Sequence, residues 1–353
     1  MRTAVVILNW NTEDYLRAFL PPLLSSCPPG AEVVVADNGS ADGSLELLAR
    51  EFPQVRTIAI GENLGFTGGY NKALAQIDAE YFLLLNSDIL VRPGWIEPLV
   101  EYMDAHPECG VCGPKLHALV GSEASGYECL DRFEYAGAAG GRLDFFGFPF
   151  CRGRVLKRTE ADEGQYDTPA RVLWVSGACL LTRASLWKEL GGLDSRFFAH
   201  MEEIDYCWRV ARKGYVVTVV PQSVVWHLGG GTLKPDSPFK LELNYRNNLL
   251  LLENNLPATV GAFRARVRIC VRWMLDLATA AVYLVTGKLA YFKAVFRAHR
   301  GYRKLRREVP RTPSGHAPVA GYWKICVILQ SLLRGAGVFT YLRQYEDSHC
   351  GSR

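Results

Sequence analysis

The first 115 residues alternate short apolar runs of strand length with segments that have the periodicity of amphipathic helices. This alternation is typical of an α/β fold, because each helix returns the chain so that successive strands lie parallel. The expected strands are residues 3–8, 32–36, 55–60 and 81–85, and the expected helices are residues 13–24, 42–51, 70–77 and 95–105. We therefore predict an α/β fold with a mostly parallel central sheet flanked by helices.

The pattern changes twice in the rest of the chain. Residues 121–170 are rich in Gly, Phe and Arg with weak periodicity, and we interpret them as loops and hairpin strands that cover a site. Further strands are expected at residues 171–181, 215–220 and 224–227, with helices at 184–190 and 202–213. From Lys240 the pattern is helical to the end. We divide the chain into a catalytic region (1–257, with halves 1–115 and 116–257) and a C-terminal helical extension (258–353).

Lysine and arginine are concentrated in this extension. Residues 264–308 contain 12 Lys and Arg against 2 Asp and Glu, whereas the rest of the chain has 28 against 34. The longest uncharged stretch of the segment, residues 277–287, has 11 residues, while a spanning helix needs ~20 apolar residues. We therefore expect amphipathic helices that lie on an anionic membrane surface. The alternative is that these helices only pack on the catalytic region, with their arginines in water.

The amino terminus runs directly into a strand pattern, without the apolar segment and cleavage site of a secretory signal. We expect a cytoplasmic protein that is peripheral on the cytoplasmic face of the inner membrane. Its ten cysteines form no disulfide framework. Cys109 and Cys112 have C-x-x-C spacing but lack the second pair or histidines of a zinc site, so we interpret them as buried structural thiols.

Two common nucleotide-binding patterns are absent from the sequence. There is no G-x-x-x-x-G-K-[ST] loop, which argues against a nucleoside triphosphatase, and no G-x-G-x-x-G after the first strand, which argues against a dinucleotide enzyme. A nucleotidyltransferase would need a glycine- and lysine-rich phosphate loop near the amino terminus, and none is present. We expect no nucleic-acid partner.

Polar clusters follow four successive predicted strands. They begin at Asn9, Asp37, Glu62 and Asn86. Ligands of parallel α/β sheets bind at the carboxyl ends of the strands. A single cluster would be an ordinary turn, but four at successive strand ends indicate a lined cleft.

These clusters resemble those of family 2 inverting glycosyltransferases with the GT-A fold, and the rhamnosyltransferase-like branch is the most similar. The resemblance covers roughly residues 3–257 and is highly specific, because order and spacing both match. It rests on Asn9-Trp10-Asn11, Asp37-Asn38-Gly39-Ser40, Glu62-Asn63-Leu64-Gly65, Asn86-Ser87-Asp88, Ser176-Gly177-Ala178, Gly191-Gly192-Leu193-Asp194, Phe197-Phe198, the run from Glu202 to Arg209, and His227.

The resemblance assigns the donor nucleotide to the first half of the chain. It implies that Asp37 accepts the N3–H of a uracil or thymine base, and that Asn9 and Asn11 hold base and ribose. The remaining donor-binding residues that it implies are Asn38, Asn63, Gly65, Asn86 and Ser87, with Asn86 orienting the ribose or a metal-bound water.

The resemblance also implies a metal and a base. Asn86-Ser87-Asp88 matches the D-x-D position, with Asn in place of the first acid, so Asp88 is the expected direct ligand and His227 the second. A divalent cation, Mn²⁺ or Mg²⁺, would neutralise the diphosphate leaving group. The family usually has Glu-Asp where this chain has Glu202-Glu203, which makes Glu203 the expected catalytic base. Asp205 and Arg209 are spaced to form an i,i+4 pair on the same helix.

We thus expect a transferase that moves a sugar from a nucleoside-diphosphate donor to a lipid-linked or polysaccharide acceptor. The branch resemblance points to L-rhamnose from dTDP-β-L-rhamnose. UDP-galactofuranose, UDP-glucose or another pyrimidine donor stays open. The alternative from another functional class is a non-catalytic membrane scaffold that binds sugar nucleotides.

Overall fold

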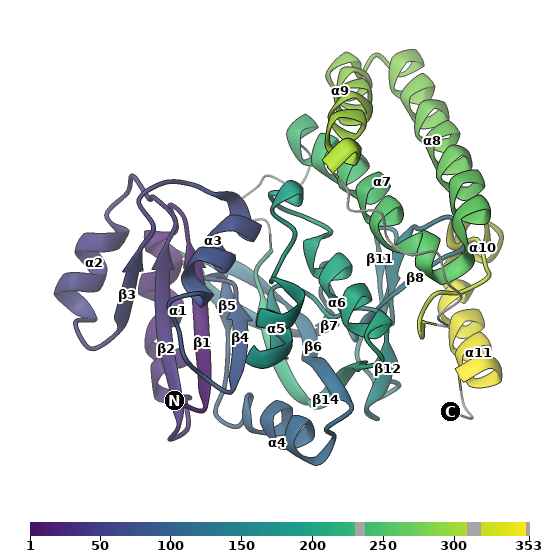
Figure 1. The fold of residues 1–353 in the computed structure, drawn as a ribbon. Helices are drawn as coiled ribbons and strands as arrows, with labels where there is room; N and C mark the ends of the chain where they lie inside the picture. Colours follow the sequence, from purple (N-terminus) through teal and green to yellow (C-terminus); the bar gives the residue numbers. More distant parts are fainter. Residues whose placement is uncertain (230–236, 309–318, 351–353) are drawn as a thin grey trace.

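A computed structural model describes residues 1–229, 237–308 and 319–350 of the chain (Figure 1). Residues 309–318 and 351–353 of the expected helical extension therefore lie outside the described residues. The first strands and helices follow the alternation expected from the sequence: β1 (Thr3–Asn9), α1 (Glu13–Ser25), β2 (Ala31–Asp37), α2 (Ser44–Glu51), β3 (Arg56–Ala59), α3 (Gly65–Leu74), β4 (Tyr81–Leu85), β5 (Ile89–Leu90) and α4 (Glu97–Ala105). Helix α3 begins and ends earlier than the helix expected over residues 70–77.

Within the described residues, the central sheet has ten strands in the order β12-β14-β6-β13-β4-β1-β2-β3, with β5 beside β14 and β7 beside β6. Strands β1, β2, β3 and β4 run parallel to their neighbours in this half, whereas β13 runs antiparallel to β4 and to β6. The later strands and helices of this region are β6 (Cys109–Ser122), β7 (Gly126–Phe133), β12 (Ala170–Val172), β13 (Cys179–Arg183), α5 (Ala184–Leu190), α6 (Glu202–Arg212) and β14 (Val216–His227). The expected α/β fold is confirmed.

Each face of the central sheet carries its own core. Alternate residues of the parallel strands point to opposite faces, so Val5 and Ile7 pack with α1, α2 and α4, while Ala4 and Val6 pack with α3, α5 and α6. The sheet therefore lies between two helical layers, and its carboxyl-end loops are left at one edge (Figure 1).

A second, four-stranded sheet stands beside the first and meets the C-terminal helices. It consists of β8 (Gly141–Leu143), β9 (Pro149–Cys151), β10 (Arg154–Val155) and β11 (Arg158–Thr159). The helices that follow are α7 (Pro238–Val260), α8 (Ala262–Val285), α9 (Leu289–Leu305), α10 (Val327–Arg334) and α11 (Val338–Cys350). Phe150 and Val155 of this sheet share a hydrophobic cluster with Trp323, Val327 and Phe339.

The structure departs from the expected elements in several places. The 14-residue strand β6 was not expected at all. The single strand expected at 171–181 is two strands, β12 and β13, which lie in different parts of the sheet. The strands expected at 215–220 and 224–227 are one strand, β14, with an irregularity in its pairing to β6 between Val219 and Val224. The division at residue 257 falls inside α7, and the separate extension stays a proposal.

Candidate active site

The ends of β1 and β2 are joined by a network of amide and carboxylate side chains. Asn9 is fully buried, and its Nδ2 donates to Asp37 Oδ1 at 2.8 Å and to Ser40 Oγ at 3.0 Å. The other oxygen of Asp37 accepts the Ser40 N–H at 3.0 Å. Asn11 joins the same turn, because its Oδ1 accepts the Ala41 N–H at 2.7 Å. Asn9, Asn11 and Asp37 therefore meet, and contact of Asp37 with a nucleobase stays a prediction.

A second network connects this edge to the start of α3. Asn38 Nδ2 donates to Asn63 Oδ1 and to the Gly65 carbonyl, both at 3.1 Å, and Asn38 Oδ1 accepts the Leu64 N–H at 3.1 Å. Gly65 has a φ of 71°, and a Cβ there would lie 2.4 Å from a ring carbon of Phe198. Only glycine fits this position without strain. Asn38, Asn63 and Gly65 are thus neighbours at one strand end.

Asp88 and His227 meet because β5 pairs with the end of β14. His227 stands opposite Ile89 in antiparallel register, and Asp88 directly precedes β5. The Leu228 N–H also donates to the Asp88 carbonyl at 3.1 Å. Both side chains are buried, and His227 Nε2 lies 3.2 Å from Asp88 Oδ1. Two residues 139 positions apart in the sequence are thereby brought into contact.

Glu134, which the sequence reasoning missed, lies on the other side of His227. It follows β7, is buried, and places Oε2 3.4 Å from His227 Nδ1. Burial by itself would lower the pKa of His227, but the carboxylates of Asp88 and Glu134 outweigh it and raise that pKa well above its ordinary value. No motif marks Glu134, because the β6–β7 hairpin alone brings it to this place.

Asp88 and His227 fit a divalent cation that has positions open to a substrate. Adjacent ligand atoms of an octahedral ion at ~2.1 Å lie about 3 Å apart, close to the 3.2 Å between Asp88 Oδ1 and His227 Nε2. In the described part of the chain, no group of three or more His, Cys, Asp or Glu could hold a metal. Ions that act on phosphates commonly take one or two protein ligands and complete their shell with substrate oxygens and water. Glu134 behind the imidazole is the partner that a metal-binding histidine usually has.

Two adjacent carboxyl groups begin α6. Glu202 is buried and Glu203 is partly buried, and neither Oε2 has a hydrogen-bond partner in the described residues. Burial, and then repulsion from Glu203, raises the pKa of Glu202 well above its ordinary value. Burial also raises the pKa of Glu203, to about 7, although backbone N–H groups at the start of α6 lower it. Carboxyl oxygens that are buried without a hydrogen-bond partner are typical of functional positions.

Glu203 lies close to the strand end that carries Asn86. A Cβ added to Gly177 would lie 3.5 Å from Glu203 Cβ and 3.3 Å from the Phe66 ring. The next residue, Ala178, accepts the Asn86 N–H at 2.9 Å. The nearby Ser87 hydroxyl accepts a hydrogen bond from Thr12, at the β1 end, at 3.0 Å. The expected base and the expected donor residues therefore border one edge of the sheet.

The loop before α6 has an unusual backbone. Phe198, His200 and Met201 have φ values of 65°, 71° and 73°, although none is glycine. Such backbone costs of order 1–3 kcal/mol per residue and persists only where surrounding contacts enforce it. Asn247 of α7, fully buried, enforces it here: its Nδ2 lies 2.7–2.9 Å from the carbonyl oxygens of Phe197, Ala199 and His200. Sequence reasoning missed Asn247, although it is a polar residue before a run of leucines.

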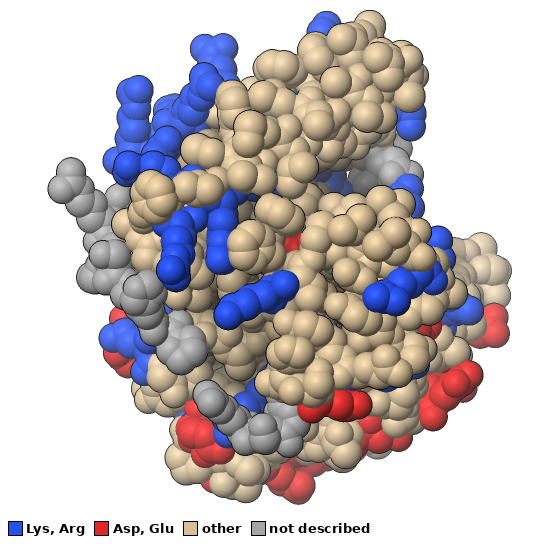
Figure 2. All heavy atoms as spheres, turned by 90° about the vertical axis from the view of Figure 1, so that its right-hand side faces the viewer, with Lys and Arg blue, Asp and Glu red and all other residues tan. Residues whose placement is uncertain are grey.

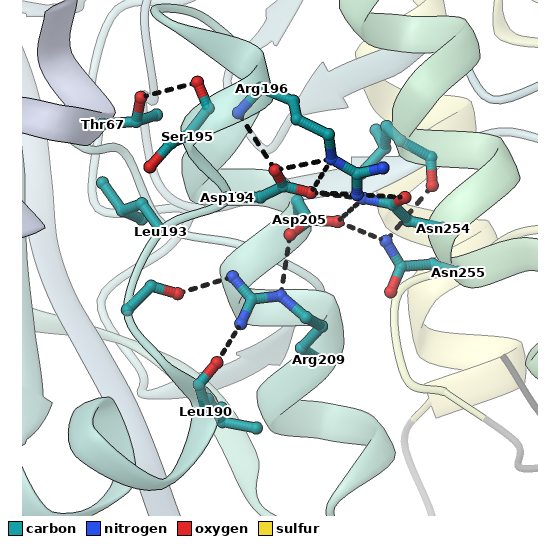
Figure 3. Close-up of polar contacts among 12 residues, drawn as sticks. Thr67, Leu190, Leu193, Asp194, Ser195, Arg196, Asp205, Arg209, Asn254 and Asn255 are labelled. Carbon is teal, nitrogen blue, oxygen red and sulfur yellow. Dashed lines mark hydrogen bonds and ion pairs between the residues drawn. The ribbon is translucent and has the colours of Figure 1, made fainter. Parts of the chain in front are cut away.

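A polar network also anchors α6 to α7 (Figure 3). Asp205 is fully buried and accepts from Arg209 Nε at 2.7 Å, which confirms the expected i,i+4 pair. Asp205 Oδ1 also accepts from Asn254 at 3.0 Å and from Asn255 at 2.8 Å. Asn254 further accepts from Arg196 at 3.0 Å, on the loop that leads to α6. The helix that carries Glu203 is thus held on its inner side by buried charge.

An open groove of about 490 Å³ adjoins the Asp88–His227 pair. Tyr15 and Tyr127 line it together with Asp14 and Leu228, the residue whose N–H bonds to the Asp88 carbonyl. Aromatic faces combined with carboxylates suit the apolar faces and hydroxyl groups of sugars.

Comparison with known proteins finds similarity to glycosyltransferases. Residues 4–128 match the model of the family described as Glycosyl transferase family 2. An N-acetylglucosaminyl-diphospho-decaprenol L-rhamnosyltransferase of Mycobacterium tuberculosis is 27% identical over 284 residues, which cover 77% of this chain and 90% of that protein. The O-antigen biosynthesis protein RfbC of Myxococcus xanthus is 25% identical over 67% of this chain and 18% of its own length.

Solved structures of glycosyltransferases have the same fold. GalNAc-T7, crystallised with UDP, GalNAc and Mn²⁺, superposes with a TM-score of 0.57 at 18% identity over 72% of this chain, which spans about half (48%) of that chain. TarS residues 1–349 of S. aureus superpose with a TM-score of 0.53 at 15% identity, covering 88% of this chain and 83% of that one. These likenesses concern the fold alone.

Proposed function

We propose that this chain is a family 2 glycosyltransferase that transfers L-rhamnose, with inversion, from dTDP-β-L-rhamnose to a lipid-linked acceptor. The match of residues 4–128 to the family model and the GT-A fold support this proposal. The mycobacterial rhamnosyltransferase supports this donor and acceptor class, since its similarity extends over 77% of the chain and thus beyond the donor-binding half. Relatives at this identity often differ in substrate, so UDP-galactofuranose and UDP-hexoses are the donors to compare.

The observation that carries the proposed chemistry is the arrangement at the sheet edge. Asp88 and His227 form a buried pair, and Glu203 presents a carboxyl oxygen that has no hydrogen-bond partner in the described residues. A diphosphate can be bound at the pair while an acceptor hydroxyl approaches Glu203. The Mn²⁺ in the GalNAc-T7 crystals supports a divalent ion in this proposal.

In the proposed reaction, the acceptor oxygen attacks the anomeric carbon on the face opposite the diphosphate. The new C–O bond forms as the bond to dTDP breaks, and dTDP leaves with the electron pair. Glu203 accepts the proton of the attacking hydroxyl. A divalent cation, when bound, would neutralise charge on the leaving diphosphate. Asp88 and His227 would hold that ion, and the Asn9–Asp37 network would hold the nucleoside.

A lipid-linked acceptor is located in a membrane, and this suggests where the protein acts. We place the reaction at the cytoplasmic face of the inner membrane, with the protein bound peripherally. In the described residues, no helix is both long and apolar enough to cross a bilayer.

A donor screen tests the proposal. Purified protein is incubated with a polyprenyl-diphosphate-linked GlcNAc acceptor and with dTDP-L-rhamnose, UDP-galactofuranose or UDP-glucose, and nucleotide release is measured with Mn²⁺, Mg²⁺ or EDTA. We expect release with dTDP-L-rhamnose and a metal, and an inverted anomeric centre by NMR. Full activity in EDTA would exclude the metal role, and a retained anomeric centre would exclude Glu203 as the base. Donor binding without transfer to any acceptor would favour the non-catalytic scaffold.

A further inference from the structure

Helix α8 has its apolar side facing outward. Its exposed stripe consists of residues three or four positions apart, which lie on one helical face: Phe263, Val267, Cys270, Met274, Ala278, Val282 and Val285. Phe263 is 81% exposed and Val285 is 82% exposed. A surface helix of a protein in water normally shows the opposite arrangement, with polar residues outward.

The inner side of α8 carries a buried ion pair. Arg272 and Asp276 are buried and paired at 2.9 Å, and His299 of α9 lies 3.3 Å from the same carboxylate. Arg272 also stacks over Phe148 at 3.8 Å, and Arg268 over Phe145 at 3.9 Å. These contacts fix α8 against the loop between β8 and β9. The outward apolar stripe is therefore a rigidly held surface.

Helix α10 extends this surface. Leu332 and Leu333 are 76% and 71% exposed, and Leu329 is half exposed. Helices α8 and α10 lie on the same side of the molecule (Figure 1). Figure 2 shows this side directly: uncharged atoms dominate its upper part, Lys and Arg gather at its upper left and extend across its middle, and Asp and Glu gather mainly along the lower rim. Arg264 and Arg266 lie between the first two residues of the α8 stripe in the sequence, Lys288 follows its last residue, and all three are exposed.

We propose that the outward stripe of α8, together with the α10 leucines, inserts into the interfacial zone of an anionic lipid bilayer. The inference rests on the proposed function, because a lipid-linked acceptor requires the active site to approach a membrane. At ~1.5 Å per residue, the 24 residues of α8 form a line about 36 Å long, which suits a helix lying in the membrane plane.

Charge favours lipid over a second copy of the chain. A symmetric dimer through this face would bring the same basic residues of both copies together, and residues 264–308 carry a net charge of +10. Anionic headgroups would instead be attracted to them, by ~1 kcal/mol per basic residue near the surface.

The structure also indicates whether the basic or the apolar residues determine binding to the membrane. The basic run at the end of α9, which includes Arg303 and Arg306, is partly engaged within the protein: Arg303 lies 5.5 Å from the Trp273 ring, and Arg306 pairs with Glu253 at 3.4 Å. The proposal therefore assigns insertion to the apolar residues of α8 and α10, and gives the basic residues a supporting electrostatic role.

Vesicle flotation of the full chain tests this assignment. The vesicles contain phosphatidylcholine with or without phosphatidylglycerol. The double variant Phe263→Ser/Val285→Ser removes the two most exposed residues of the stripe, and Leu45→Ser is the control, because this exposed leucine lies on α2, in the first half of the chain. We expect the native chain and the control to float with anionic vesicles, and the partition coefficient of the stripe variant to fall about 10-fold or more.

Two further measurements separate the possible failures. Equal flotation of the native chain and the stripe variant would overturn the proposal, as would a native dimer in sedimentation velocity that the stripe variant loses. Transfer to a water-soluble, short-chain acceptor should be unchanged in the stripe variant, because α8 contributes nothing to the Asp88–Glu203 edge. Failure of the native chain to use that acceptor would count against the proposed function, whatever the flotation result.

Discussion

Glu203 combines a raised pKa with a position at the start of α6. Because burial raises this pKa to about 7, kcat/KM should rise with pH up to about 7 and then level off, as the base becomes ionised. Glu203→Gln should reduce kcat by ~10²-fold or more while leaving dTDP affinity nearly unchanged. The pH–rate profile and calorimetric dTDP binding check this. If Glu203→Gln were fully active and Glu202→Gln inactive, the catalytic base would be Glu202 instead.

Replacing the Glu203 carboxyl by an amide should also increase the stability of the folded protein. Its folded-state pKa of about 7 lies above its ordinary value of 4.5, so the folded state binds more protons in this interval, and stability falls as pH rises from about 4.5 to about 7. The Glu203→Gln variant has no carboxyl at this position to ionise, so its stability does not fall in this way. Its Tm should be higher than that of the native protein at pH 8, and the difference should shrink at pH 4.5. Thermal unfolding at both pH values measures it, and a lower Tm for the variant at pH 8 would contradict it.

Glu134 predicts an effect on metal binding that is separate from activity. Its carboxylate lies behind the imidazole of His227, and partners of this kind typically contribute 10–100-fold to metal affinity. Glu134→Ala should weaken Mn²⁺ binding by at least ~10-fold in calorimetry, whereas Asp88→Ala should abolish it. Glu189→Ala, which removes an exposed carboxylate that pairs with Lys213, is the control. Unchanged Mn²⁺ affinity in Glu134→Ala would limit Glu134 to a structural role.

At this scale the sequence predicts residues that belong to motifs and misses those that only tertiary contacts bring in. Asp88 and His227 were expected as a pair and lie in contact. Asn9, Asn11 and Asp37 were expected at the ends of two successive strands. Asn9 donates to Asp37, and Asn11 accepts from the Ala41 N–H of the turn that follows Asp37. Glu134 and Asn247 reach the site through a hairpin and a distant helix, so no local pattern indicates them.

At the scale of elements, Asn247 connects α7 to the geometry of α6. Without its amide, the carbonyls of Phe197, Ala199 and His200 lose their shared donor, and the strained loop should relax. A displacement of about 1 Å at a catalytic group can reduce the rate by ~10², so Asn247→Ala should lower kcat at least ~10-fold with little change in donor KM. Asn248→Ala, which removes a bond to the Gly147 carbonyl instead, is the control. Equal kcat values for the two variants would contradict a positioning role.

Strand β6, which was not expected from the sequence, shows that packing in the sheet outweighs the local preference of the backbone for a loop. Strand β6 contains Gly110, Gly113 and Pro114, which indicate a loop in isolation. In the sheet both glycines are needed, because a Cβ at Gly110 would lie 2.8 Å from Leu186 and Val210 side-chain carbons, and one at Gly113 would lie 2.9 Å from Val175. The helix–strand alternation of the first half was predictable because apolar runs of strand length alternate there with segments of helical periodicity.

At the scale of the whole molecule, the C-terminal helices complete the second sheet. Asp144, fully buried, accepts the Val327 N–H at 3.0 Å and two N–H groups of its own turn. Glu346 of α11 pairs with Arg142 and Arg152, and Arg343 pairs with Glu160. The sequence suggested an extension from residue 258, but these contacts predict that the extension and residues 142–160 unfold together.

Truncation after residue 257 tests that cooperativity. The shortened chain would expose the apolar side of Phe150 and Val155, deprive Glu160 of Arg343, and end inside α7 before Thr259, which accepts from Trp208 at 3.1 Å. Several lost contacts at ~1–3 kcal/mol each should lower Tm by about 10 °C or more. The full chain should unfold in one calorimetric transition, and the truncated chain should bind a hydrophobic dye. The opposite outcome is two transitions in the full chain, with the upper one retained at the same Tm after truncation. It would mean that residues 1–257 fold as an independent domain and that the C-terminal helices only attach this domain to the membrane.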